Sequence, residues 1–218
     1  MNYRLIVLTH GDHQEELLRT ISSFSEMVEP SPVEKHLVVD GPFASHHLDF
    51  SDWKLHPSKK QEGFCAAVYR GWEEVAAPPG VEWVFWLEHD FLFRRPVDLR
   101  DIAKVMNRND QLAQMSLMRQ PVNARELAAG SILAADPDSF GRHQDPEGRW
   151  LSQKIYWTTN PSLFPRELAT QRTWPLEKQC EGVFTHELLA DDPGIEFGIW
   201  GSGESWVEHI GVRTGKGY

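Results

Sequence analysis

Three apolar segments in the first ninety residues each run into polar side chains. They cover residues 3–9 (YRLIVLT), 35–40 (KHLVVD) and 81–87 (VEWVFWL). Valine, isoleucine and aromatic side chains are frequent in these segments, a composition typical of buried strands rather than of helices. We therefore predict three short strands, and we expect the third, rich in tryptophan, to be the central one.

Two amphipathic segments separate these strands. Residues 15–24 carry apolar side chains at helical spacing, namely Leu17, Leu18, Ile21 and Phe24. We expect Asp12 to cap this helix, with Glu15 completing a box-like spacing. A second helix is predicted over residues 64–76, where the sequence AAPPG ends it. The alternation of strand, helix and strand is the beginning of a parallel α/β sheet.

The order of elements is less regular beyond residue 93. The pattern still indicates a helix over residues 97–106 and a strand over residues 112–118. Residues 119–153 show weak periodicity, so we expect a long loop there, and such loops are usually functional or mobile. Further elements are an extended segment over residues 157–165, a short helix over 181–189 and a short strand around Trp206.

Length and composition favour one domain without a membrane segment. A chain of 218 residues is the usual size of a single domain, and a hydrophobic fraction of 40 % is enough for a sizeable core. The apolar runs are shorter than the roughly 20 residues of a membrane span. The two cysteines, Cys65 and Cys180, have no metal-binding or redox spacing, which favours reduced thiols in a cytoplasmic protein.

The net charge of −10 is unevenly distributed along the chain. Residues 1–90 contain 7 Lys and Arg against 15 Asp and Glu, residues 91–172 contain 12 against 9, and residues 173–218 contain 3 against 8. The corresponding net charges are −8, +3 and −5. An acidic chain argues against tight non-specific binding of nucleic acid, whereas a basic middle third leaves room for an anionic partner.

Two carboxylates follow the third predicted strand. Glu88 and Asp90 are two residues apart, and in an extended chain such residues point to the same side. In open α/β sheets, ligands bind at the carboxyl ends of the strands. Neighbouring carboxylates repel each other, and a bound Mg²⁺ or Mn²⁺ would remove this repulsion. The alternative is that both carboxylates are solvated at an ordinary strand end.

Four segments, in the right order, resemble those of nucleotide-sugar-dependent glycosyltransferases of the GT-A fold, close to the family-2-like group. They are LIVLTHGD at the first strand, VVDG at the second, GFCAAVYRGW at the second helix and WVFWLEHDF at the third strand. The last segment is similar to the metal-binding D-x-D strand of these enzymes. A fifth segment, VEHIG, stands where many of them place a metal-ligating histidine.

The resemblance implies an α/β protein of the GT-A fold, with a Rossmann-like, mostly parallel sheet flanked by helices in a single domain. Residues 1–93 would form the nucleotide-sugar half, and residues 94–218 the acceptor half and the C-terminal metal-ligand segment. Two departures are visible in the sequence. Glu88 replaces the first aspartate of the D-x-D motif, and Ala-Val-Tyr stands where the family helix commonly has Ala-Arg-Asn. Either Arg70 replaces that arginine or its phosphate contact is lost.

The same resemblance implies a metal site and a catalytic base. Asp90, Glu88 and His209 would bind Mn²⁺ or Mg²⁺, with Asp90 as the direct ligand, and such a cation acts as a Lewis acid on phosphate oxygens. Glu181, at the start of a late helix, would be the base. Its rivals are His186, Glu187 and Asp191. The structural alternatives are a half-buried histidine at position 209 and a helix-start carboxylate at position 181 that the helix dipole favours.

The nucleotide-sugar donor is expected to contact residues at the ends of the first three strands and along the second helix. These are Thr9, His10, Asp40, Gly63, Arg70 and Glu88. Asp40 would accept a hydrogen bond from the base or the ribose, but an aspartate before glycine is also a common turn residue. Lys59 and Lys60 precede the helix and are either phosphate-binding residues or a solvated loop pair.

The predicted activity is transfer of a sugar from a nucleotide-sugar donor, UDP-sugar favoured, to an acceptor hydroxyl. One acceptor is a 5-hydroxymethylated pyrimidine in DNA, because the chain resembles small phage enzymes that act on modified DNA in the host cytoplasm. The cations that favour DNA are Arg94, Arg95, Arg100, Arg108, Arg119, Arg125, Arg142, Arg149 and Lys154. The aromatic residues Trp150, Tyr156, Trp157 and Trp174 suit stacking on sugars or bases, or else belong to the core.

Other acceptors and two other classes of protein are compatible with these residues. The acceptor could be a glycan, a lipid-linked sugar or a protein hydroxyl. A nucleotidyltransferase shares a related sheet and metal, but usually begins with a Gly-rich phosphate loop, which THGDHQEE does not resemble. A non-catalytic sugar-binding module is the third alternative, and the presence of Glu88, Asp90 and His209 together argues against it.

Overall fold

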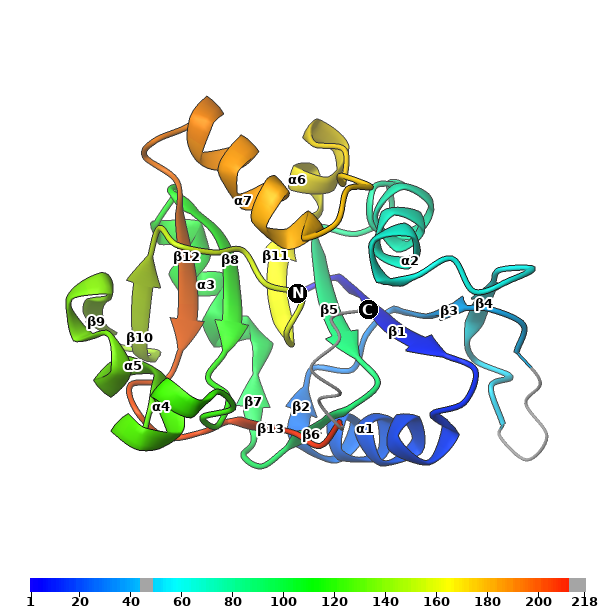
Figure 1. Ribbon diagram of the computed structural model, residues 1–218, viewed down its shortest axis with the longest axis horizontal. Coiled ribbons are helices and arrows are strands. Elements are labelled where there is room, and N and C mark those ends of the chain that lie inside the picture. The colour runs from blue at the N-terminus through cyan, green and yellow to red at the C-terminus, as the bar shows by residue number, and fades with distance from the viewer. Residues whose placement is uncertain (44–48, 212–218) are drawn as a thin grey trace.

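A nine-stranded sheet runs through the protein, and helices cover both of its faces (Figure 1). This computed structural model describes residues 1–43 and 49–211. The strands of the sheet are β1 (Tyr3–His10), β3 (Glu34–Asp40), β4 (Lys54–Pro57), β5 (Trp83–Glu88), β8 (Leu112–Leu117), β9 (Gly141–Asp145), β10 (Gly148–Gln153), β11 (Ser162–Pro165) and β12 (Glu196–Trp200). Two short pairs accompany it, β2 (Val28–Glu29) with β7 (Val97–Asp98) and β6 (Phe91–Phe93) with β13 (Val207–His209).

The helices differ in length and in the face of the sheet that they cover. They are α1 (Gln14–Met27), α2 (Phe64–Arg70), α3 (Leu99–Arg108), α4 (Ala124–Ala129), α5 (Ile132–Ala135), α6 (Arg166–Gln171) and α7 (Cys180–Asp191). A π-helical turn, Gly71–Ala76, continues α2, and a 3₁₀ turn, Pro137–Ser139, follows α5. Within the described ranges, no helix combines the length and the apolar character needed to cross a bilayer.

The first half of the sheet is parallel, as predicted. The strand order is β4-β3-β1-β5-β11-β8-β12-β10-β9, and the strands from β4 to β5 all run in one direction. In the second half, β11 is antiparallel to both β5 and β8, and β10 is antiparallel to both β12 and β9. The complete sheet is therefore mixed, because β11 and β10 run opposite to the other seven strands.

Alternate residues of β1 face two separate cores. Tyr3, Leu5 and Val7 pack with α1 and α3, whereas Ile6 and Leu8 pack with α2 and α7. In Figure 1, α1 lies below the sheet, and α2, α6 and α7 lie above it. Successive side chains of a strand point to opposite faces, so a strand covered on both faces needs apolar residues at nearly every position. This requirement explains the continuous apolar run that predicted β1.

Three tryptophans proposed for stacking on sugars or bases belong to these cores. Trp150, Trp157 and Trp174 are only 1–2 % exposed. The ring of Trp72 lies 5.8 Å from that of Trp157 and 5.3 Å from that of Trp174. Perpendicular and tilted ring pairs at these distances stabilise the core beyond the area that they bury. The stacking hypothesis is wrong for these three residues, while Tyr156 is partly exposed.

Two local predictions also differ from the structure. The residue before α1 is His13, whose side chain makes no cap hydrogen bond, so Asp12 is not the N-cap. Residues 119–153 are not a long loop, because they contain α4, α5 and the hairpin β9–β10. Asn123 and Glu126 form a capping box at the start of α4. These elements have six residues or fewer, too few to produce a clear hydrophobic period.

A disulfide between Cys65 and Cys180 joins α2 to α7. The two Cα atoms lie 5.9 Å apart, within the usual range for disulfides. This pairing corrects the expectation of reduced thiols. The cysteines are 115 residues apart in the sequence, and they meet because α2 and α7 pack on the same face of the sheet. The bond therefore fixes the first turn of one helix against the first turn of the other.

Arg4 and Glu34 form a partly buried charge network at the amino-terminal ends of β1 and β3. The Arg4 guanidinium donates to Glu34 Oε2 at 2.5 Å and to the carbonyl oxygen of Val75. Lys54 Nζ donates to Glu34 Oε1 at 2.8 Å. The hydrogen bonds from Lys54 and Arg4 outweigh the effect of burial and lower the pKa of Glu34 to about 2.

We predict that Glu34→Gln lowers the free energy of unfolding by about 1–2 kcal/mol at pH 7, a value reduced for the 28 % exposure of this side chain. Because the pKa is depressed in the folded state, the difference from wild type is complete above pH 4.5 and disappears as the pH falls towards about 2. Urea denaturation at several pH values measures it. Asp52→Asn, which removes the exposed partner of Lys35, is the control. An equally large loss in the control would contradict the prediction.

Removal of the disulfide should be visible in stability and in peptide maps. Cys180→Ala should lower the free energy of unfolding by about 2–4 kcal/mol relative to the oxidised protein. A reductant should destabilise the wild type by a similar amount and leave the variant unchanged. Digestion without reductant should recover a linked pair of peptides that contain Cys65 and Cys180. Unlinked peptides under these conditions would show that the bond does not form.

Candidate functional site

The carboxyl ends of β1, β3 and β5 meet at one edge of the sheet, the edge at which the sequence predicts the site. In the parallel register, His10 at the end of β1 pairs with Asp40 at the end of β3. β5 ends at Glu88, and a turn that contains Asp90 leads from it into β6. Parallel pairing therefore brings together side chains that are up to 80 residues apart in the sequence.

Asp90 is a buried carboxylate with one paired and one unpaired oxygen. Its Oδ2 lies 3.1 Å from His209 Nε2, and its exposed fraction is 5 %. Its Oδ1 has no hydrogen-bond partner within the described ranges. Burial opposes ionisation of Asp90, but the hydrogen bond from His209 and the proximity of His89 outweigh it and lower the pKa of Asp90. The group is thus an anion that is incompletely compensated by its surroundings.

The segment that carries His209 is fixed to the rest of the protein. β13 pairs antiparallel with β6, directly after Asp90. The Gln120 side chain accepts from His209 N–H and donates to the His209 carbonyl oxygen, both at 2.9 Å. A Cβ atom on Gly211 would collide with Asp90 Oδ2, so the chain passes against this carboxylate as closely as a glycine permits. The imidazole of residue 209 is therefore held at Asp90.

Glu88 and Glu181 share the hydroxyl group of Thr159. Thr159 Oγ1 lies 2.7 Å from Glu88 Oε1 and 2.8 Å from Glu181 Oε1, and Thr159 N–H also donates to Glu181 Oε1 at 2.7 Å. One hydroxyl has one proton and cannot donate to both carboxylates. All three groups are satisfied when Glu88 is protonated and donates to Oγ1, while Oγ1 donates to Glu181. Burial, and then repulsion from Asp90 and Glu181, raise the pKa of Glu88, in agreement with this arrangement.

The residues expected to hold a divalent cation carry ligand atoms that suit this role. Carboxylate oxygens and an imidazole nitrogen are ligands that Mn²⁺ accepts, and Glu88 and Asp90 interact closely enough to repel each other. The buried, unpaired Oδ1 of Asp90 is the decisive feature, because such an atom is costly unless a donor or a cation satisfies it. Asp90 and His209 are in contact and could share a cation, whereas the contribution of Glu88, whose carboxyl group contacts Thr159, stays a prediction.

A small recess lies beside these carboxylates. It is lined by Leu8, Thr9, His10, Asp40, Phe64, Ala67, Glu88 and His89. The Asp40 carboxylate accepts from Glu62 N–H at 2.7 Å and from Gly63 N–H at 2.9 Å, so it fixes the loop before α2. Gly63 has a φ of 93°, which residues with a side chain rarely adopt. Its carbonyl oxygen accepts a hydrogen bond from Ala67 N–H at the start of α2. Four of the residues expected at the donor, Thr9, His10, Asp40 and Glu88, therefore line one recess.

Arg70 lies apart from this recess and has a different role from the one expected. Its guanidinium donates to the carbonyl oxygens of His56 and Val39, at 2.7 and 2.9 Å. These bonds tie the end of α2 to β3 and β4. The expectation that Arg70 replaces the phosphate-binding arginine of the family helix is therefore corrected: its hydrogen-bonding capacity is directed at the backbone of the sheet.

The structure also separates Glu181 from its rivals on α7. His186 and Glu187 are exposed, and Asp191 pairs with Arg172. Glu181 is the α7 residue whose carboxylate reaches Thr159 and acts electrostatically on Glu88. Of the four candidates on α7, Glu181 is thus the residue that joins the cluster.

Two residues of the site were missed from the sequence. Thr159 belongs to the segment Trp157-Thr158-Thr159-Asn160. The polar run after the tryptophan was the only sign in the sequence that this segment could contribute to a site. Gln120 carried no signal, because its partner His209 is 89 residues away. Both act by hydrogen bonds that depend on the tertiary structure.

Comparisons with known proteins identify the fold. No protein-family model and no curated protein matches this sequence. A crystal structure of GalNAc-T7 with UDP, GalNAc and Mn²⁺ superposes with a TM-score of 0.68 at 10 % identity, covering 99 % of this chain and 45 % of that one. A structure of S. aureus TarS with UDP gives 0.64 at 13 % identity, covering 95 % and 60 %. This chain thus spans about half the length of these proteins and has the predicted GT-A fold.

The shared hydroxyl of Thr159 gives a direct test of the cluster. Thr159→Val keeps the shape of the side chain but removes the group between Glu88 and Glu181. We expect it to lower the free energy of unfolding by about 1–3 kcal/mol, the cost of leaving buried polar groups unpaired. Thr159→Ser retains the hydroxyl and is the control. Urea denaturation of both variants measures the effect, and equal stability of the valine and serine variants would show that the hydroxyl bridges nothing.

Proposed function

We propose that this protein is a metal-dependent glycosyltransferase that moves a sugar from a nucleotide-sugar donor, UDP-sugar favoured, to an acceptor hydroxyl. The observation that carries the proposal is the convergence of Glu88, Asp90, His209 and Glu181 at the carboxyl edge of a GT-A sheet. The likeness to GalNAc-T7, solved with UDP, GalNAc and Mn²⁺, and to TarS, solved with UDP, supports the donor and the metal.

The donor is proposed to occupy the recess beside β1 and β3. Asp40 would accept from the base or the ribose with lone pairs that the backbone of residues 62–63 leaves available. Thr9 and His10 line the same recess, at the end of β1. Gly63, which precedes α2, keeps this loop free of a side chain. The donor half therefore corresponds to residues 1–93.

The cation in this proposal is Mn²⁺ or Mg²⁺, and when bound it would neutralise the diphosphate leaving group as a Lewis acid. Asp90 would be a direct ligand, because its Oδ1 is buried and has no partner in the described part of the chain. His209 would contribute a ring nitrogen. Glu88 must ionise to become a ligand, so its proton would be released on binding.

Glu181 is proposed to remove the proton of the acceptor hydroxyl. The N–H and Oγ1 of Thr159 both engage Oε1 of Glu181, which orients the carboxylate and leaves Oε2 for the acceptor. A general base works only when its oxygen is held within hydrogen-bond reach of the proton that it takes. This role implies inversion of configuration at the transferred sugar, because the hydroxyl attacks directly.

The charge pattern supports a neutral hydroxyl acceptor, such as a glycan, over hydroxymethylated DNA. Cations of the basic middle third pair with carboxylates: Arg94 with Glu208, Arg100 with Asp98, Arg108 with Glu147, Arg119 with Glu126, and Arg125 with Asp136. A cation that is already paired gains less from binding a phosphate backbone. Arg142 and Arg149 are exposed on the hairpin β9–β10, so charge reversal there tests the DNA alternative.

The assay that decides the reaction class is hydrolysis of a panel of nucleotide sugars with and without Mn²⁺. Asp90→Asn should lower the Mn²⁺-dependent rate by roughly a thousandfold or more, since several kcal/mol of charge stabilisation are lost. Asp101→Asn, a carboxylate-to-amide change on the surface helix α3, is the control and should behave as wild type. Near-full activity of Asp90→Asn would remove the metal assignment.

The same panel separates the other classes of protein. Release of pyrophosphate from a nucleoside triphosphate would indicate a nucleotidyltransferase, and sugar binding without turnover would indicate a binding module. Acceptors added to the panel should include a glycan, a lipid-linked sugar, a hydroxylated peptide and hydroxymethylated DNA. Transfer to DNA that high salt suppresses would favour the DNA acceptor over the neutral one.

A further inference from the structure

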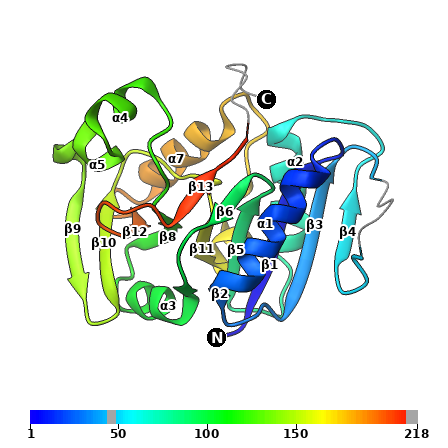
Figure 2. The ribbon, with the colours of Figure 1, turned by 90° about the horizontal axis from the view of Figure 1, so that it is seen from below.

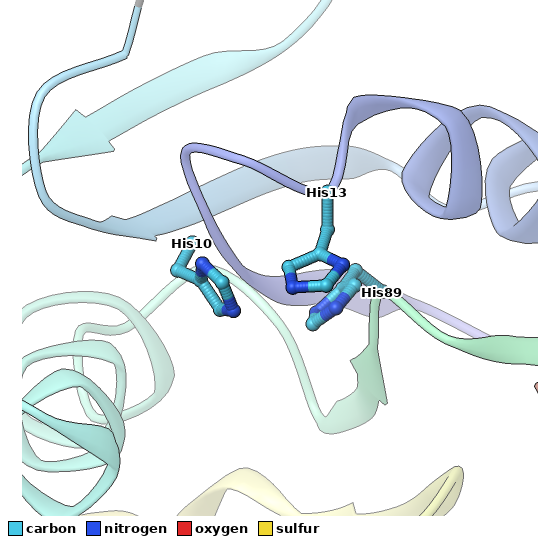
Figure 3. Close-up of side chains that lie close together, drawn as sticks. All are labelled: His10, His13 and His89. Carbon is cyan, nitrogen blue, oxygen red and sulfur yellow. The ribbon is translucent and has the colours of Figure 1, made fainter. Parts of the chain in front are cut away.

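Three histidines converge beside the recess (Figure 3). His10 ends β1, His13 stands directly before α1, and His89 follows β5. One ring nitrogen from each lies within 4.8 Å of the other two. The ring centroids of His10 and His13 are 4.1 Å apart, and those of His13 and His89 are 4.8 Å apart. Three separate segments thus direct imidazole rings at one another.

The backbone around these histidines is fixed by hydrogen bonds. His13 N–H donates to the carbonyl oxygen of His10 at 3.3 Å. His89 N–H donates to the carbonyl oxygen of Leu8 at 3.0 Å, and Thr20 Oγ1 donates to that of His89 at 2.6 Å. Rigid support of this kind is what a pre-formed site requires, because little ordering is then left for the ligand to induce.

The surroundings of the three rings favour a cation. His13 Nδ1 lies 3.5 Å from Glu16 Oε1, so one ring nitrogen faces a carboxylate. Histidines that bind metals usually direct their second nitrogen at a carboxylate, carbonyl or water. Burial and His13 lower the pKa of His10, and Asp12, Asp40 and Asp90 act on it more weakly in the opposite direction. His10 and His13 are partly exposed, which leaves a path for an ion from solvent.

We propose that His10, His13 and His89 bind a transition-metal ion such as Zn²⁺, in a site distinct from that of Asp90. Imidazole nitrogens suit Zn²⁺, Ni²⁺ and Cu²⁺, whereas the carboxylates of the Asp90 site suit Mg²⁺ and Mn²⁺. Zinc binds imidazole nitrogen at about 2.0–2.1 Å. The three ring nitrogens already lie within 4.8 Å of one another, so small rotations of the side chains would bring them to this distance from one ion. Three protein ligands leave a fourth position for water or a ligand atom.

This histidine site is testable without any assay of activity. Co²⁺ replaces Zn²⁺ in nitrogen sites and reports its coordination by visible absorption. We expect one equivalent of Co²⁺ to give a visible band with the full-length protein, and Zn²⁺ to displace it. His13→Asn should weaken Zn²⁺ binding by more than the roughly 10- to 100-fold that loss of a ligand's carboxylate partner costs. Glu16→Gln, which removes such a carboxylate partner, should weaken Zn²⁺ binding by roughly 10- to 100-fold.

Three variants separate loss of the histidine site from a loss of folding and from metal binding at Asp90. Asparagine is a favoured N-cap, and His13 precedes α1 without a cap hydrogen bond, so His13→Asn should not destabilise the helix. His186→Asn removes an exposed histidine on α7 and should bind Co²⁺ as wild type does. Asp90→Asn should keep the cobalt band while it loses Mn²⁺ binding. Wild-type affinity in His13→Asn, or loss of the band in Asp90→Asn, would overturn the proposal.

Discussion

Repulsion between carboxylates at the end of β5 is the constraint on which the site depends. Asp90 and Glu181 both act electrostatically on Glu88, where burial weakens solvation by water and strengthens the repulsion. The fold relieves this repulsion in two ways: Thr159 links a protonated Glu88 to Glu181, and His209 pairs with one oxygen of Asp90 and leaves the other without a partner in the described ranges. Groups with strongly perturbed ionisation in a recess are characteristic of functional sites. A cation bound at Asp90 would relieve the repulsion.

This compensation requires support from distant parts of the chain, and the topology provides it. β13 pairs with β6 directly after the turn at Asp90, and Gln120 fixes the backbone of His209. On the other side of the site, the disulfide holds the start of α7, which carries Glu181, against the start of α2, which borders the recess. Figure 2 shows β6 and β13 next to each other, although more than one hundred residues separate them in the sequence. The site is therefore assembled from both halves of the protein.

The turn after β5 serves two neighbourhoods with different chemistry. His89 and Asp90 are consecutive, yet the ring of His89 lies with His10 and His13, whereas the carboxylate of Asp90 lies with His209. One side of the turn presents nitrogen atoms and the other presents mainly carboxylate oxygens, and these attract different metal ions. The recess is lined by His10 and His89 together with Glu88, so it lies between the two groups.

The sequence by itself determined β1, α1, β3, α2 and β5, although it did not indicate the short strands β2 and β4. Long apolar runs and helical spacing are local signals, and the parallel order of β1, β3 and β5 follows from them. It also named Asp90, Glu88, His209 and Glu181, through residue types at positions that resemble a family. Only the tertiary structure decided the pairing of Cys65 with Cys180, the backbone role of Arg70, the burial of the tryptophans and the bridging role of Thr159. Each of these depends on which distant segments pack together, and short elements such as α4, α5 and the β9–β10 hairpin leave no period in the sequence from which that packing could be predicted.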